Sequence, residues 1–365
     1  MKSIAVFFCG QSVEHDISII TGVLTANSLD KEKYLPIPIY VGHNGVWYTG
    51  DELLDLDNFK RINLQKLTQV TFISGDNALY SVNKNRLKKI DNVAVAVNCM
   101  HGERGEDGSL SGLLNMCKVP FVCPPLAASA ICMDKTLTKI FLKGIGVKTL
   151  KSVTVEGIGQ TQQVFKSLQF PLIVKPSKLG SSIGISKAET PNELNFAVSY
   201  ALKFCQSAII EPLLNDFVEI NCAAYMDESG EIKVSQCERP VGRTNILSFK
   251  DKYESGKRIF PADISEKYSN KIMQTTFKIY SALNARGIIR IDYFICKGEV
   301  FVNEINTVPG SLAYYLYSDT LKGFTQILNS LIRVAEKEFA VESTLVKSFD
   351  SGVLKSFGSK GAKKR

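Results

Sequence analysis

The chain of 365 residues is predicted to be a mixed α/β protein of two or three domains. Continuous apolar runs such as residues 4–9 (IAVFFC) alternate with helix-like stretches such as residues 16–29. This alternation is typical of buried parallel strands joined by helices. Closer to the C-terminus, apolar segments at residues 288–296 and 300–305 flank a Lys-Gly turn signal, which favours an antiparallel hairpin. We therefore expect an α/β N-terminal part and an α+β remainder.

The other elements of the N-terminal part follow from the same patterns. Residues 93–98 (VAVAVN) indicate a second buried strand. Further strands are expected at residues 35–41 and 119–123, with a helix at residues 109–118. The polar and mixed stretch at residues 46–90 gives no assignable pattern.

The best-marked helix of the remainder follows Thr190, which is expected to cap it, with Pro191 in its first turn and Glu193 as capping-box partner. Residues 238–261 form a long charged and aromatic stretch, which is typical of a lid or binding loop. Strands are expected at residues 171–175, 183–186, 208–211, 218–225 and 232–237, and helices at residues 134–143, 265–286 and 321–339.

Charge and cysteine content narrow the class of protein. The formal net charge is +8, but the segment from Val346 onward carries six basic residues and one acidic residue, which leaves +3 for the rest. That body charge is weak ground for nucleic-acid binding, and we expect residues 356–365 to be disordered. The nine cysteines form no CxxC pair. No apolar run reaches the length of a membrane span. We expect a reduced, cytoplasmic protein with no membrane partner.

Four polar residues mark the expected hairpin: Arg290, Asp292, Glu304 and Asn306. Residues two apart on a strand share a face. One register sets Asp292 opposite Glu304 and Arg290 opposite Asn306, and it separates polar from apolar side chains.

The same register sets Ile295 opposite Phe301 and leaves a three-residue loop at 297–299. The carboxylate and amide oxygens that it brings together are ligands that suit Mg²⁺. A solvated polar face on a half-buried hairpin explains the pattern about as well.

A loop rich in glycine and serine follows the strand that ends at Lys175. Gly180 and Gly184 allow backbone N–H groups to approach an anion, and Ser181 and Ser182 add hydroxyl donors. A plain hairpin turn accounts equally well for the loop taken alone.

Three further charged residues stand at the ends of expected elements. Lys135 begins a helix, where phosphate is favoured, although a single lysine is more often a surface residue. Glu211 ends a strand and could read an adenine amino group, and Glu219 could hold ribose hydroxyls. Each of these signals is weak without its neighbours.

Two loops follow buried strands in the N-terminal part. Residues 10–18 (GQSVEHDIS) offer Glu14 for a substrate ammonium group, or merely as a capping carboxylate. Residues 101–108 (HGERGEDG) set His101 at the carboxyl end of a strand, where ligands of α/β proteins gather. A lone histidine is nevertheless usually structural.

Together these segments resemble the D-alanine–D-alanine ligases of the ATP-grasp superfamily, from about residue 4 to residue 339. The motifs occur in the order expected for that family: GQSVEHDIS, HGERGEDGSLSG, MDK (133–135), VKPSKLGSSIGISK, IIEPLL, DKY (251–253), RID and NEINTVPGS. Jointly they are highly specific.

The resemblance implies an ATP-grasp fold, in which two antiparallel sheets hold ATP between them. The expected units are an N-terminal α/β (preATP-grasp, Rossmann-like) domain at residues 1–124 and a central ATP-grasp subdomain at residues 125–219. A C-terminal subdomain with the lid loop follows at residues 220–345, and a basic tail at residues 346–365.

The resemblance also implies roles for individual residues. For ATP, these are phosphate contacts from Lys135, Lys175 and Lys252, a covering loop with Ser181 and Ser182, adenine contacts from Glu211 and the Leu214 backbone, and a ribose contact from Glu219. For the metal, Mg²⁺ or Mn²⁺ and two ions in all, the ligands are Asp292, Glu304 and Asn306. For the substrates, Glu14 binds the first ammonium, His101 lies nearby, and Arg290 and the Gly310 N–H stabilise the oxyanion. A hydrogen-bonded link of Glu14, Ser181 and Tyr253 closes the loop over the site.

The implied activity is the ATP-dependent joining of two D-alanines through an acyl phosphate, for peptidoglycan synthesis. The expected partners are D-alanine and ATP, with no nucleic acid, and the expected assembly is a homodimer. A ligase that uses D-serine or D-lactate as the second substrate, or a catalytically silent nucleotide-binding module, remains an alternative. The silent module would be marked by loss of a metal ligand or of the oxyanion arginine, and neither is lost.

Three positions depart from the family pattern. Cys9 stands where glycine is common, and Phe249 replaces a lid aromatic that often carries a hydroxyl. After Gly310 the chain reads SLAYYLY, where many members have a serine that helps to bind the carboxylate of the second substrate. Ser311 and Leu312 are the candidates for that role in this chain.

Overall fold

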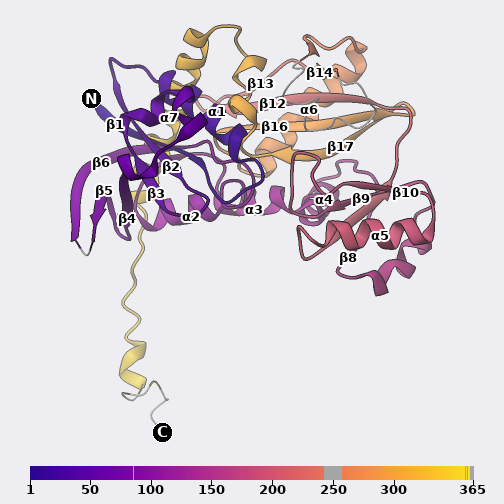
Figure 1. Cartoon of the computed structure of the whole chain (residues 1–365), viewed down its shortest axis with the longest axis horizontal. Coiled ribbons are helices and arrows are strands. Elements are labelled where there is room, and N and C mark those ends of the chain that lie inside the picture. The colour runs from indigo at the N-terminus through magenta and orange to yellow at the C-terminus, as the bar shows by residue number, and fades with distance from the viewer. Residues whose placement is uncertain (85, 242–256, 358, 360, 362–365) are drawn as a thin grey trace.

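The computed structural model describes every residue of the chain except 85, 242–256, 358, 360 and 362–365. It contains three larger β-sheets and a short two-stranded ribbon, with helices on their faces. Figure 1 shows the first sheet at one end of the molecule and the other two at the opposite end. The predicted mixed α/β class is confirmed.

The first sheet has seven strands, β1 (Lys2–Cys9), β2 (Tyr34–Val41), β3 (Trp47–Thr49), β4 (Thr68–Ile73), β5 (Asp76–Asn83), β6 (Arg86–Asn98) and β7 (Phe121–Val122). Its buried centre is parallel, because β1 pairs with β2 and β6, and β6 with β7. The unassigned stretch 46–90 supplies β3, β4, β5 and the first half of β6, which pair antiparallel. The short helices η1 (Asp51–Leu54), η2 (Leu56–Arg61) and η3 (Leu64–Lys66) join β3 to β4.

Helices cover both faces of this sheet. One face carries α1 (His15–Asn27) and also α7 (Leu321–Ser343), whose Phe324, Leu328 and Ile332 share a core with Phe8 of β1. The other face carries α2 (Ser109–Met116). The last long helix of the chain therefore packs on the first strand, although it falls in the range expected for the C-terminal subdomain.

The second sheet has the order β10-β9-β11-β8 and is antiparallel throughout. Its strands are β8 (Val153–Val155), β9 (Leu172–Pro176), β10 (Ser186–Ala188) and β11 (Ala208–Pro212). The helix α5 (Pro191–Ala201) covers it, and Thr190 caps α5 by accepting the Glu193 N–H at 3.3 Å, as predicted. The helical segment η4 (Ile158–Lys166) also packs here, while α3 (Leu126–Met133) and α4 (Lys135–Gly144) pack on the third sheet.

The third sheet has the order β13-β12-β16-β17. Its strands are β12 (Val218–Met226), β13 (Ile232–Val234), β16 (Ile288–Cys296) and β17 (Glu299–Asn306), packed against α6 (Glu266–Ala282). The ribbon of β14 (Arg239–Pro240) and β15 (Arg258–Ile259) brackets residues 242–256. The segments η6 (Gly310–Leu316) and η7 (Val353–Ser356) complete the described elements.

Several boundaries differ from the prediction, such as that of the strand expected at 232–237, which ends at Val234, and backbone geometry explains two of the differences. The strand expected at 183–186 begins only at Ser186, because Ser181, Ser182 and Gly184 have φ of 54°, 58° and 74°, which is turn geometry. The helix expected at 265–286 ends at Ala282, and Asn284 follows with φ 46°. Within the described residues, no helix combines the length and the apolar character needed to cross a membrane.

Candidate active site

Two neighbouring hollows lie beside the loops that join these sheets. The cleft is lined mainly by apolar side chains, such as Ile173 of the second sheet, Phe294 of the third sheet and Leu214 in the segment that joins them. The cavity, of about 460 Å³, has eight charged side chains in its described lining, and Glu219 lines both hollows. An apolar slot beside a charged chamber suits a ligand with a flat ring at one end and phosphates at the other.

Most of the residues singled out from the sequence lie at these two hollows. The cleft is lined by Lys135, Lys175, Ser182, Glu211, Leu214, Glu219 and Glu304. The cavity is lined by Glu14, His101, Glu219, Arg290, Asp292, Asn306, Gly310 and Ser311. Lys252, Tyr253 and Phe249 lie outside the described residues.

The hairpin of β16 and β17 has the predicted register at its polar end. Asp292 lies opposite Glu304, and Arg290 opposite Asn306. Beyond Asp292 a bulge inserts Asn303 as an unpaired residue. This bulge turns Asn303 to the cleft, where its Oδ1 lies 3.3 Å from Lys175 Nζ.

The bulge makes two predictions wrong. Ile295 lies opposite Val300, and Phe301 opposite Phe294. The turn is a two-residue one, in which Lys297 and Gly298 have φ of 49° and 77°, the backbone expected of a type I′ hairpin. A single extra residue within the strand shortened the loop by one.

Asp292 is the most deeply buried carboxylate of the hairpin, at 1% exposure. Arg290 donates to it twice, from Nε to Oδ1 at 2.8 Å and from Nη2 to Oδ2 at 3.0 Å. Asn306 Nδ2 also donates to Asp292 Oδ2, at 3.2 Å. Arg290 and Asn306 therefore hold this carboxylate in one orientation.

The oxygens of Asp292, Glu304 and Asn306 form a hard donor set that fits Mg²⁺ or Mn²⁺. Across the part of the chain that the structure describes, no three His, Cys, Asp or Glu side chains are arranged to hold a metal. An ion at the hairpin thus depends on the Asn306 amide oxygen as its third protein ligand.

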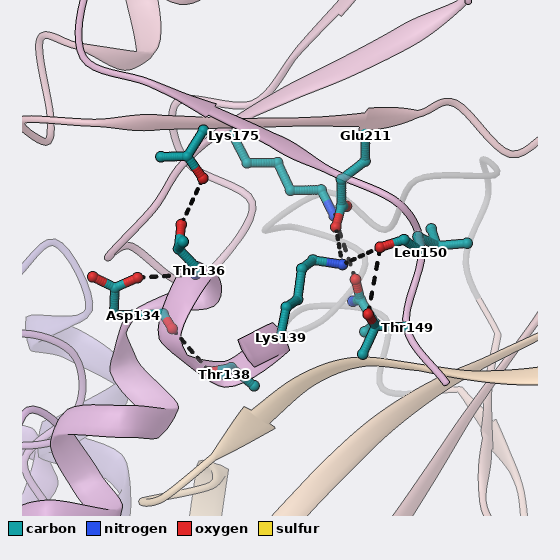
Figure 2. A network of polar contacts seen from close by, with 10 residues as sticks. Asp134, Thr136, Thr138, Lys139, Thr149, Leu150, Lys175 and Glu211 are labelled. Carbon is teal, nitrogen blue, oxygen red and sulfur yellow. Dashed lines mark hydrogen bonds and ion pairs between the residues drawn. The ribbon is translucent and has the colours of Figure 1, made fainter. Parts of the chain in front are cut away.

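Glu211 carries both of its carboxylate oxygens in ion pairs. Lys139 Nζ lies 2.5 Å from Oε1, and Lys175 Nζ 2.7 Å from Oε2 (Figure 2). Burial alone raises the pKa of Glu211, but the two ammonium groups outweigh it and hold that pKa at about 2. Its side chain therefore orients two lysines in this structure, and an adenine contact from it stays a prediction.

Lys135 lies at the start of α4, whose N-cap Asp134 accepts the Thr136 N–H at 2.9 Å. The Lys135 ammonium donates to the Leu179 carbonyl at 2.6 Å. Burial lowers the pKa of Lys135, and the Glu304 carboxylate opposes that shift. A lysine held so close to the glycine-serine loop can contact an anion under that loop.

The glycine-serine loop is tied directly to the N-terminal part of the chain. Ser181 is buried, and its hydroxyl donates to the Glu14 carboxylate at the start of α1. Two of the three members of the link predicted from the resemblance are therefore hydrogen-bonded. The third, Tyr253, lies outside the described residues.

The His101 ring is buried beside the cavity, with Nε2 2.9 Å from Thr21 Oγ1. Burial, with a smaller effect of the Arg290 charge, lowers the pKa of His101 to about 3, so the ring is neutral near pH 7. Thr21 Oγ1 also accepts the Ser311 N–H at 3.0 Å. Thr21 thus connects the His101 ring to the segment that follows Gly310.

That segment has an unusual backbone. Ser311, Leu312 and Ala313 have φ of 51°, 49° and 48°, a left-handed run that L-residues rarely adopt. The Leu312 side chain is buried, and its N–H donates to the Pro309 carbonyl at 2.8 Å. The backbone N–H groups of both residues proposed for the second carboxylate thus have protein partners.

Cys9, at another departure from the family pattern, has φ 75°, a conformation that favours glycine.

Several residues at the site were not singled out from the sequence. Glu106 accepts the Gly102 N–H at 2.9 Å and the Val308 N–H at 3.0 Å. Lys139 follows Lys135 by one helical turn, a spacing that could have indicated a shared face. Arg258 and Tyr315 line the cavity, and no pattern in the sequence singles them out.

Two family models match the chain: D-ala D-ala ligase N-terminus over residues 3–124, and D-ala D-ala ligase C-terminus over residues 142–333. A D-alanine–D-alanine ligase of Thermosipho melanesiensis is 34% identical, over 97% of this chain and 99% of its own. The solved D-alanine–D-alanine ligase of Coxiella burnetii has a TM-score of 0.82 at 26% identity, covering 96% of this chain and 99% of its own. The VanG D-Ala:D-Ser ligase of Enterococcus faecalis has a TM-score of 0.78 at 28% identity, covering 92% and 99%.

These matches span nearly the whole chain and agree with the ATP-grasp arrangement of its sheets. The protein therefore belongs to the D-alanine–D-alanine ligase family of ATP-dependent ligases.

Proposed function

We propose that the protein joins two molecules of D-alanine into D-alanyl-D-alanine for peptidoglycan synthesis, converting ATP to ADP and phosphate. The observation that carries this proposal is the contact between the two hollows, because the cleft and the cavity meet at Glu219. The family of the chain supports the same activity. In this proposal ATP binds in the cleft and both amino acids bind in the cavity.

The first step forms an acyl phosphate. A carboxylate oxygen of the first D-alanine attacks the γ-phosphorus of ATP, and ADP leaves. Glu14 holds the ammonium group of that D-alanine, and its bond to Ser181 positions it. Lys135 and Lys175 line the cleft where negative charge accumulates and offset it.

The second step forms the peptide bond. The amine of the second D-alanine attacks the carbonyl carbon of the acyl phosphate, the phosphate leaves, and the nitrogen loses a proton. Arg290, fixed by its two bonds to Asp292, and the Gly310 N–H stabilise the oxyanion of the tetrahedral intermediate. An acyl phosphate is hydrolysed when water reaches it. We therefore propose that Lys252 and Tyr253, on the lid loop, exclude water from the site.

We propose that Asp292, Glu304 and Asn306, the hard donors of the hairpin, bind two divalent ions. These ions are Mg²⁺ or Mn²⁺. When bound, the metal supplies positive charge to the phosphate oxygens. The protein itself orients the metal ligands. Arg290 and Asn306 do so for Asp292, because both donate hydrogen bonds to its carboxylate.

The second substrate has an alternative. A relative that matches 92% of this chain is a D-Ala:D-Ser ligase, so D-serine is a candidate acceptor, and D-lactate is a further one. Tyr253 matches family members that use an amino acid, which argues against D-lactate. We favour D-alanine over D-serine, because the relatives that cover nearly the whole chain include D-alanine–D-alanine ligases. We also propose that the protein forms a homodimer and that it is located in the cytoplasm.

The test measures ADP and phosphate release from purified full-length protein. Release should require both D-alanine and Mg²⁺, and mass spectrometry should detect the dipeptide. Competition among D-alanine, D-serine and D-lactate then identifies the acceptor. Absence of any dipeptide-like product under these conditions would contradict the proposed function.

A further inference from the structure

The cavity contains more positive charge than the oxyanion alone requires. Among the described residues, its lining includes three cations: Lys257, Arg258 and Arg290. Arg290 is committed to Asp292 through two bonds. Every candidate acceptor also carries a carboxylate, and none of the roles proposed for Glu14, Arg290 or the Gly310 N–H binds that group.

The backbone N–H groups of Ser311 and Leu312, the two residues considered above for that carboxylate, have protein partners. The Ser311 N–H donates to Thr21 Oγ1 at 3.0 Å, and the Leu312 N–H to the Pro309 carbonyl at 2.8 Å. Breaking either bond for a ligand has a cost that offsets the new bond. These two N–H groups are therefore poor candidates, and a donor elsewhere on the cavity wall is favoured.

Arg258 has the position and the chemistry for this task. It lies on β15, and its side chain is 34% exposed. Its guanidinium carbon is 4.5 Å from the centre of the Tyr315 ring, a distance typical of a cation–π contact. Tyr315 also lies beside Arg290, whose charge opposes the rise in the Tyr315 pKa that burial causes. The ring thus connects the oxyanion arginine to a second arginine along one wall.

The donors of Arg258 are only partly used. Among the described residues its one ion pair, from Nη1 to Glu238 Oε1, is 3.5 Å long, at the limit for a hydrogen bond. A guanidinium carries five N–H donors in a fixed planar fork that matches a carboxylate. Arg258 can therefore keep Glu238 as a partner and still bind a second carboxylate with Nε and Nη2.

We propose that Arg258, seated on the Tyr315 ring, binds the α-carboxylate of the acceptor amino acid. This proposal rests on the proposed function and names the residue that makes a free carboxylate a requirement in the second substrate. It concerns the acceptor alone, because the ammonium of the first D-alanine is assigned to Glu14 and its carboxylate becomes the acyl phosphate.

The test compares two acceptors that differ only in that group, D-alanine and D-alaninamide. Both are supplied together with ATP and Mg²⁺, and mass spectrometry measures the ratio of the dipeptide to its amide. Wild-type protein should form mainly the dipeptide. In Arg258→Gln the ratio should fall by about tenfold or more, because a hydrogen bond to a charged group is lost, while the KM for ATP stays unchanged. Arg258→Lys should keep part of the preference.

The matched control is Arg239→Gln, on the paired strand β14. Arg239 forms its ion pair with Asp263 at 2.8 Å and does not line the cavity, so this variant should keep the wild-type ratio. If Arg258→Gln keeps the ratio, or slows both products equally, the proposal is wrong. If wild-type protein makes no dipeptide at all, the proposed function fails instead, and the two failures are distinguishable.

Discussion

The Glu106 carboxylate accepts the backbone N–H of Val308 at 3.0 Å. Its other oxygen accepts the Gly102 N–H at 2.9 Å. One side chain thus bonds the loop that carries His101 to the segment that leads into Gly310. Burial, and then the charge of Glu14, raise the pKa of Glu106, while the two N–H donors oppose that rise.

Replacing Glu106 by Gln should loosen this connection. An amide turns an NH₂ group toward one of the two N–H donors, so one hydrogen bond is lost. We expect kcat/KM to fall about tenfold and the free energy of unfolding to fall by roughly 1–3 kcal/mol. Steady-state kinetics and urea unfolding measure the two effects. The exposed neighbour Glu103 gives the control Glu103→Gln, which should change neither.

Asp292→Asn should abolish turnover while the protein stays folded. The change removes a metal-ligand charge and one acceptor of the Arg290 fork. We expect kcat to fall about 100-fold or more and Mn²⁺ binding, followed by electron paramagnetic resonance, to weaken. Asp263→Asn, at an exposed ion pair with Arg239, is the control. Unchanged turnover in Asp292→Asn would remove the metal assignment.

Glu211 should make stability depend on acidity. Its pKa is about 2 in the folded protein and near 4.5 when unfolded. Below about pH 4.5 the unfolded chain therefore binds more protons, and folding stability falls as the pH drops towards 2. The stabilisation is fully present above that window and amounts to about 3 kcal/mol at most. Urea unfolding at a series of pH values should show a shallower slope for Glu211→Gln, and equal slopes would contradict the assignment.

Deleting residues 356–365 should leave ligase activity within about twofold of wild type. Figure 1 shows the described residues around η7 projecting away from the three sheets, and none of the described residues from Val346 onward lines the cleft or the cavity. We therefore expect the basic charge of the tail to play no part in the reaction. ADP release by the truncated protein measures this, and a large loss would show that the tail contributes to the site.

Elements with a complete local signal were predictable from the sequence. The run of β1 is apolar at nearly every position, and α5 is marked by Thr190 and Pro191 at its start. By contrast, β4 buries only two of its six residues, so its alternation is short and weak. The α3 sequence LAASAICM has no polar face to give a helical period. Such elements form because a neighbouring strand or helix covers them.

Some features of the candidate site could likewise be predicted from the sequence, and others could not. Asp292 and Glu304 could be set opposite each other because one register alone separates polar from apolar residues. The bulge at Asn303 shifts only part of the ladder, and no composition rule marks it. The pairing of Lys139 with Glu211 joins α4 to β11, and a contact between distant segments requires the fold itself.

The packing of α7 on β1 has a consequence for synthesis of the protein. Phe8 of β1 shares its core with Phe324 and Ile332 of α7, so β1 leaves the ribosome long before the helix that covers it. Until α7 has been synthesised, that face of the N-terminal sheet stays partly uncovered and exposes apolar surface that favours chaperone binding or aggregation.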